Sequence, residues 1–170
     1  TMGERIMPQG LLPSMNFHDL YKNCELCPNL CRVNRAGGKT GRCRMDDRMR
    51  VARASLHAWE EPPLCGGKGS GTIFFVGCPM GCVYCQNRSI SRGQGGESVN
   101  LEQLCAIMLK LEEIGAANIN LVTATPFIPD LLYAIPEARR QGLKIPIVWN
   151  SSGYERVSVI RMLDGLIDIY

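Results

Sequence analysis

The sequence lacks long hydrophobic runs and any strong excess of one charge. No apolar run reaches the roughly 18 residues that a membrane-spanning helix needs. The first residues also lack the apolar core of a signal peptide. The 170 residues carry a formal net charge of only +3, which is too small for a nucleic-acid-binding surface. We therefore expect a cytoplasmic protein with neither a membrane nor a nucleic acid as its partner.

Cysteine, by contrast, is abundant, although no export signal accompanies it. The chain has nine cysteines, and eight of them precede residue 90. Disulfide frameworks belong to secreted proteins, whereas clustered cysteines in a reducing compartment usually bind metals. Seven of the nine fall into two tight groups, so the sequence predicts metal or cluster binding at both.

The chain divides by composition into four stretches. Residues 1–19 are a lead-in, 20–57 form a small cysteine-rich module, 58–71 are a Pro/Gly-rich connector, and 72–170 form an α/β domain. Because 45% of the residues are hydrophobic, the last stretch can bury a core.

Short apolar runs alternate with segments of helical periodicity from residue 72 onward. Asn100 is a suitable N-cap and Gly115 a suitable stop for the first helix, and Pro136 should kink or shorten the second. This alternation predicts a parallel sheet with right-handed crossovers. The expected strands are 72–77, 119–125, 145–151 and 166–170, and the expected helices are 101–115, 130–142 and 155–165.

These segments make about four βα units, which is the first half of a parallel βα barrel. Four strands cannot close a barrel of six or eight strands. We therefore expect a truncated chain, or an open sheet that a partner completes.

The segment CPMGCVYC contains Cys78, Cys82 and Cys85 directly after the first expected strand. Gly77 and Gly81 give the backbone the freedom to loop around a cluster. A structural zinc or a ferredoxin cluster takes four protein ligands, so three cysteines leave one iron of a [4Fe-4S] cluster open.

This motif, with Tyr84 just before its last cysteine, resembles the radical S-adenosylmethionine (SAM) superfamily. The segments GSGTIFFVGCPMGCVYCQN, NINLVT, IPIVWNSSGYE and IDIY are similar to proteins related to pyruvate formate-lyase activating enzyme. They are most similar to a branch with an N-terminal cysteine-rich module. The resemblance runs from about residue 20 to the end.

The resemblance implies the first half of a radical SAM barrel and its chemistry. In that superfamily the open iron binds the amino and carboxylate groups of SAM, and reductive cleavage gives a 5′-deoxyadenosyl radical that abstracts hydrogen. It also implies an electron donor of the flavodoxin or ferredoxin type. The substrate implied is a protein, in the form of a glycyl radical partner.

Residues at the carboxyl ends of the expected strands are candidates for SAM binding. The family's Gly-Gly-Glu motif is replaced here by the stretch TAT, while NSSGY resembles the family's Asp-Thr-Asn-Gly stretch. The GGE at 95–97 precedes the first helix and is not that motif. Capping and loop hydrogen bonds are the alternative for the polar residues, and packing is the alternative for the tyrosine. The candidates are Tyr84, Thr123, Thr125, Asn150 and Ser151.

The first cysteine group is a complete ligand set made of Cys24, Cys27, Cys31 and Cys43. It suits an auxiliary [4Fe-4S] cluster or a structural zinc, and unmetallated thiols are the remaining alternative. Nearby arginines either stabilise thiolates or form a solvated basic face. These arginines are Arg32, Arg35, Arg42 and Arg44.

Two other functions compete with a radical SAM enzyme. One is a non-catalytic iron–sulfur electron carrier, although such carriers usually give every iron a protein ligand. The other is a truncated zinc-binding module, in which His57, Cys65 or Cys105 supplies a fourth ligand to the second group. Otherwise Cys65 should be a free thiol in a loop, and Cys105 should lie in the core.

Overall fold

The computed structural model describes residues 16–170, so most of the predicted lead-in lies outside the described residues. In chain order the elements are η1 (Phe17–Tyr21), β1 (Arg50–His57), α1 (Pro62–Cys65), β2 (Ser70–Phe75), α2 (Arg88–Ser91), β3 (Glu97–Ser98), α3 (Leu101–Glu113), β4 (Ile119–Val122), η2 (Thr125–Phe127), α4 (Ile128–Arg140), β5 (Ile147–Asn150), α5 (Val157–Ile160) and η3 (Arg161–Leu163). None of the described helices is long and apolar enough to span a bilayer.

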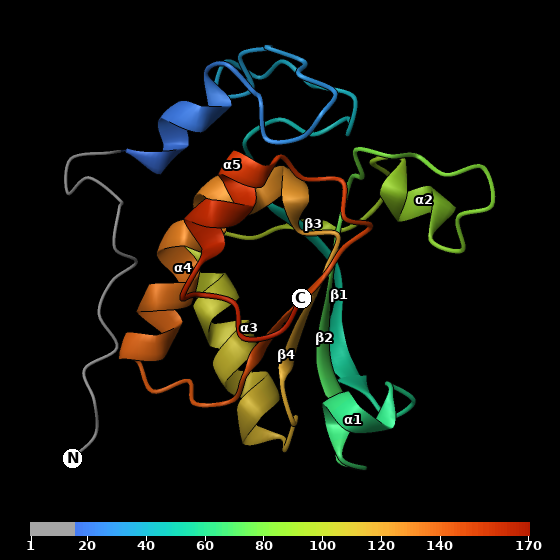
Figure 1. Cartoon of the computed structure of the whole chain (residues 1–170), viewed down its shortest axis with the longest axis vertical. Helices are drawn as coiled ribbons and strands as arrows, with labels where there is room; N and C mark the ends of the chain where they lie inside the picture. The colour runs from blue at the N-terminus through green and yellow to red at the C-terminus, as the bar shows by residue number, and fades with distance from the viewer. Residues whose placement is uncertain (1–15) are drawn as a thin grey trace.

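The strands form one mixed, open sheet in the order β3-β1-β2-β4-β5 (Figure 1). Strands β2, β4 and β5 are parallel, as the βα alternation predicted. The prediction of an all-parallel sheet was wrong, because β1 pairs antiparallel with β2 and β3 pairs antiparallel with β1. Half of the residues of β1 are exposed and only Val51 is buried, so the strand lacks the apolar run that marks the buried strands.

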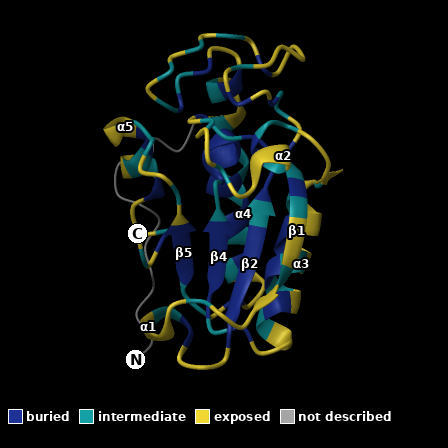
Figure 2. Cartoon of the chain, turned by 90° about the vertical axis from the view of Figure 1, so that its right-hand side faces the viewer, coloured by how far each residue is buried: buried dark blue, intermediate teal, exposed yellow. Residues whose placement is uncertain are grey.

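Helices α3 and α4 cover one face of the sheet, and Figure 2 looks onto the other face. Asn100 and Gln103 form a reciprocal capping box at the start of α3, which confirms the predicted N-cap. Helix α4 does not end at Pro136 but continues to Arg140. Its buried apolar residues hold it against the core, which outweighs the hydrogen bond that a proline removes. They include Leu131, Leu132, Ile135 and Ala138.

The last two predicted elements are shorter than expected. The predicted helix over 155–165 is limited to α5 and the short η3. The predicted strand over 166–170 makes one parallel bridge, between Val148 and Ile169, beside β5. The chain therefore has three full βα units with a fourth strand position only begun.

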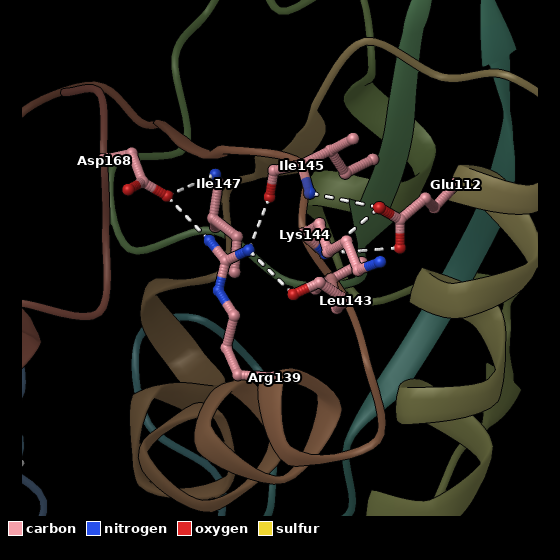
Figure 3. A network of polar contacts seen from close by, with 7 residues as sticks. All are labelled: Glu112, Arg139, Leu143, Lys144, Ile145, Ile147 and Asp168. Atoms are coloured by element: carbon pink, nitrogen blue, oxygen red, sulfur yellow. Dashed lines mark hydrogen bonds and ion pairs between the residues drawn. The ribbon is translucent and has the colours of Figure 1, made fainter. Parts of the chain in front are cut away.

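A polar network holds the segment that leads into β5 (Figure 3). Arg139 of α4 donates to the carbonyls of Leu143 and Ile145, at 3.2 and 2.7 Å, and to the Asp168 carboxylate at 2.8 Å. Glu112 of α3 accepts from the Lys144 and Ile145 amides. Both helices thus fix the start of β5, and with it the place where β5 ends.

The cysteine-rich module lies at the carboxyl ends of the parallel strands (Figure 1). Asn29 of the module donates to the Pro79 carbonyl at 2.8 Å. Arg156, after β5, forms an ion pair with Glu25 at 3.0 Å. Because ligands of parallel α/β folds bind at this edge, the module adjoins the place where a site is expected.

Candidate functional site

Strand β2 leads directly into the loop that carries the second cysteine group. Cys78 and Cys85 line a cavity of about 60 Å³, which the end of β4 also lines through Val122 and Thr123. The predicted cluster loop and one predicted SAM contact therefore share a single cavity. It is small beside the roughly 300 Å³ of a typical ligand pocket.

The middle of this loop projects away from the cavity. Cys82 is exposed, and the side chain of Tyr84 is 97% exposed, so the packing alternative for this tyrosine has no support here. Arg92, just after α2, donates to the Gly81 carbonyl at 3.2 Å and ties the loop back to the sheet. Of the three cysteines, the structure thus brings two together at the cavity and places the third at the surface.

Thr123 has an unusual backbone at the end of β4. Its φ of +57° lies in the left-handed region, which is a genuine outlier for a β-branched residue. Its amide donates to the Asn150 carbonyl at 2.9 Å, so the ends of β4 and β5 stay paired. The Asn150 residue itself is exposed. Strain of this kind collects at functional sites, where surrounding structure maintains it.

Glu155 connects the two remaining candidates and was not predicted. One of its carboxylate oxygens accepts from the Thr125 hydroxyl, and the other accepts from the Ser151 hydroxyl at 3.1 Å. Thr125 is 3% exposed, so its hydroxyl depends on this partner. The signal in the sequence was an acidic residue four positions after Ser151, in the loop that follows a strand.

The first cysteine group is gathered by a short turn of backbone. The Cys24 amide donates to the Val33 carbonyl, and the Arg32 amide donates back to the Cys24 carbonyl at 2.9 Å. Cys27 interacts electrostatically with Cys24 and Cys31, and Cys43 interacts with Cys24 and Cys27. The structure therefore places the four predicted ligands near one another, although no three side chains of the described residues converge closely enough to hold one metal ion.

Non-glycine residues with positive φ mark both cysteine groups. In the described part of the chain there are four, and Leu30, Arg32 and Arg44 are neighbours of the first group. The fourth is Thr123, at the cavity of the second group. Both predicted sites therefore depend on backbone that ordinary loops avoid.

The other cysteines and the histidine lie apart from these groups. Cys105 is fully buried on α3, as predicted, and its thiol donates to the Ala134 carbonyl. Cys65 ends α1, is buried, and donates to the Glu60 carbonyl at 3.3 Å. His57 ends β1 and is exposed. None of the three lines the cavity beside Cys78.

The second group supplies thiols, which are the ligands that an iron–sulfur cluster takes. The three sulfurs of this group do not converge on one point. Within residues 16–170, no three His, Cys, Asp or Glu side chains converge closely enough to hold one metal ion. Cys78, Cys82 and Cys85 nevertheless supply three thiols from one loop, and Gly77 and Gly81 give it two positions of positive φ.

Comparison with known proteins agrees with this geometry. Residues 72–169, more than half of the chain, match the radical SAM superfamily. An uncharacterized protein of Methanocaldococcus jannaschii is 33% identical over 159 residues, which cover 89% of this chain and 45% of that protein. The chain thus spans less than half the length of this relative, and no solved structure matches it. On the match over residues 72–169, the chain belongs to the radical SAM superfamily.

Proposed function

We propose that this chain is the cluster- and SAM-binding part of a radical SAM enzyme that abstracts hydrogen from its substrate. The observation that carries the proposal is the cavity that Cys78 and Cys85 share with Thr123. Two cysteines there lie beside the carboxyl ends of two parallel strands, which supports the proposal because parallel α/β folds bind their ligands at this edge.

Each residue has a role that its position supports. Cys78, Cys82 and Cys85 would hold three irons, and the polar groups of Thr123 and Asn150 would face the SAM that completes the fourth. Glu155 orients the Thr125 and Ser151 hydroxyls at the same edge. When bound, the cluster supplies one electron to the SAM sulfonium, so that the C5′–S bond breaks into methionine and a 5′-deoxyadenosyl radical.

The finer parts of the proposal rest on the resemblance in sequence. We infer a place in the branch related to pyruvate formate-lyase activating enzyme, a glycyl radical protein as substrate, and a flavodoxin- or ferredoxin-type electron donor. We also propose a cytoplasmic location, because the clustering of seven cysteines into two groups favours metal binding over a disulfide framework. Cys24, Cys27, Cys31 and Cys43 would hold a second metal centre, as a [4Fe-4S] cluster or zinc.

Anaerobic reconstitution tests the central step. The chain is loaded with iron and sulfide, given SAM and dithionite, and assayed for 5′-deoxyadenosine and methionine. We expect both products in equal amounts from the wild type, none from Cys82→Ala, and wild-type amounts from Cys65→Ala, whose buried thiol lies outside both groups.

Two results would contradict the proposal. Iron bound by the triad with no change in its spectrum on adding SAM indicates an electron carrier instead. Zinc without iron at the triad indicates a zinc-binding module.

A further inference from the structure

Arg35 is the only charged residue among the buried residues of the described chain. Its side chain is fully buried, and no carboxylate of residues 16–170 forms an ion pair with it. Its Nε and Nη2 atoms donate to the Asp46 carbonyl at 3.2 and 2.6 Å, and its guanidinium lies 4.5 Å from the centre of the Tyr21 ring. Its direct hydrogen-bond and ring partners are neutral, and the Asp130 and Asp46 carboxylates act on it from beyond ion-pair distance. A buried cation without a close negative partner is costly, so a negative group is expected beside it.

Besides these carboxylates and the Tyr21 phenol, the neighbours of Arg35 that can become negative are cysteines of the first group. The Nη1 atom of Arg35 lies 3.8 Å from the Cys24 sulfur and donates to it. Arg35 also interacts electrostatically with Cys43. A thiol is neutral, whereas a metal-bound cysteine is a thiolate.

The other sulfurs of the group also accept hydrogen bonds. The Asn29 side chain donates to Cys27 at 3.6 Å, and the Arg42 amide donates to Cys31 at 3.2 Å. Cys43 has a backbone hydrogen bond from Met45. Donors directed at every sulfur are the arrangement that surrounds metal-bound thiolates, since a neutral thiol is only a weak acceptor.

Two cysteines outside the group provide an internal contrast. The thiols of Cys65 and Cys105 are also buried, but each donates its proton to a backbone carbonyl. The four sulfurs of the first group have the opposite hydrogen-bond direction, which is the direction that thiolates require.

We propose that Cys24, Cys27, Cys31 and Cys43 hold an anionic metal–thiolate centre and that Arg35 is its buried counter-cation. Binding releases the four thiol protons to solvent. Zinc and a [4Fe-4S] cluster each carry a formal charge of +2, so either one bound by four thiolates has a net charge of −2. The positive charge of Arg35 brings the total to −1. The arrangement does not depend on SAM chemistry, so failure of SAM cleavage would leave it standing.

Metal analysis of anaerobically purified chain tests the ligand set. We expect Cys27→Ala and Cys31→Ala each to lose one centre, seen as one zinc or four irons per chain, while any iron at Cys78, Cys82 and Cys85 remains. Cys65→Ala and Cys105→Ala are the matched controls and should keep the wild-type content. Equal metal in all four variants and the wild type would overturn the ligand set.

Alkylation of the wild type keeps the test independent of whether a variant folds. Cys27 and Cys31 are only partly buried, so metal rather than burial should protect them. We expect iodoacetamide to label both only after the metal is removed. Equal labelling of the metal-loaded and metal-free chain would overturn the proposal.

The counter-cation is tested by Arg35→Met and Arg35→Lys. Loss of a group that hydrogen-bonds to a metal ligand lowers metal affinity about 10- to 100-fold. If the centre is zinc, Arg35→Met should therefore release it to a chelator about tenfold faster. If the centre is a cluster, the variant should have a lower reduction potential. Arg35→Lys keeps the charge and should stay nearer the wild type. If charge makes no difference between the two variants, Arg35 is a packing residue.

Discussion

Single side chains decide how the strand ends present their polar groups. Glu155 joins Thr125 and Ser151, which lie in segments that follow different strands. A carboxylate can accept from both hydroxyls, whereas a glutamine amide presents one oxygen and one donor.

With glutamine at position 155, only one of the two hydroxyls can still donate to an oxygen of that side chain. We expect a loss of unfolding free energy of about 1 kcal/mol, the usual net value of a hydrogen bond, and weaker SAM binding. Urea unfolding and titration with SAM measure the two effects. Glu113→Gln is the control, because Glu113 pairs only with Lys110 on the exposed side of α3. A Glu155→Gln variant that matches this control would contradict the assigned role.

At the scale of single residues, the sequence predicted those site residues whose spacing along the chain is distinctive. The eight-residue segment with Cys78, Cys82 and Cys85 is distinctive because few sites use three thiolates. The sequence did not predict Glu155 as a site residue, because no periodic pattern links it to Thr125 or Ser151. Its role appears only when β4 and β5 lie side by side. Arg35 was one of four arginines in a basic stretch, and only packing separates it from its exposed neighbours.

Elements are fixed by contacts that cross the fold rather than by their own propensity. Strand β5 has four residues, and its start depends on Arg139, whose guanidinium contacts two carbonyls and Asp168 (Figure 3). The next residue, Arg140, extends from the same helix but pairs with Glu137 on the surface.

These neighbouring arginines form a matched pair for mutation. Arg139→Ala leaves two carbonyls and Asp168 without this donor, so we expect a loss of about 2 kcal/mol of unfolding free energy. Arg140→Ala removes an exposed ion pair and should leave the stability unchanged. Chemical denaturation measures both. Equal stabilities of the two variants would show that the network in Figure 3 does not hold β5.

The elements that the sequence predicted best are those with strong periodicity. Helix α3 carries four buried residues on one face and a complete capping box, so its start was predicted correctly. Strand β1 was missed because only Val51 of its eight residues is fully buried. Its antiparallel pairing with β2 makes the sheet mixed, and no local pattern in Arg50–His57 indicates that pairing.

At the scale of the whole molecule, a polar contact joins the segment before β1 to helix α4. Tyr21 of the module donates its hydroxyl to Asp130 of α4, and His18 lies 3.2 Å from the same carboxylate. Burial raises the pKa of Asp130 above its usual range, and burial also raises the pKa of Tyr21. This polar contact therefore responds to pH.

The raised pKa of Asp130 determines the sign of that response. The folded chain favours the protonated carboxyl, so its contribution to stability is complete below the unfolded pKa of about 3.9 and is lost as pH rises through the folded value. Asp130→Asn keeps an acceptor for Tyr21 but does not titrate. The unfolding free energy of the wild type minus that of the variant should thus fall as pH rises above about 4. A difference that stays constant from pH 4 to 8 would contradict this linkage.

At Gly77, just after β2, the backbone packs tightly against residues 43–45 of the module. The sequence marked this glycine only as a loop residue. Its φ is +87°, and a Cβ here would lie 2.3 Å from Cγ of Met45 and 2.8 Å from the Cys43 carbonyl oxygen. Gly81, in the same loop, has a φ of +67° but no atom closer than 3.6 Å to such a Cβ. The two glycines therefore share a left-handed backbone conformation and differ in packing.

Alanine at each position separates these two effects. Gly81→Ala should cost about 1 kcal/mol, from the left-handed backbone alone. Gly77→Ala adds overpacking of about 2 kcal/mol and pushes Cys43 and Met45 away from the loop. We expect a larger loss of unfolding free energy in urea, and faster amide hydrogen exchange at residues 43–45, for Gly77→Ala than for Gly81→Ala. Equal losses would mean that the module does not pack against Gly77, and its place at the carboxyl ends of the strands would then depend on its other contacts, which include those of Asn29, Tyr21 and Arg156.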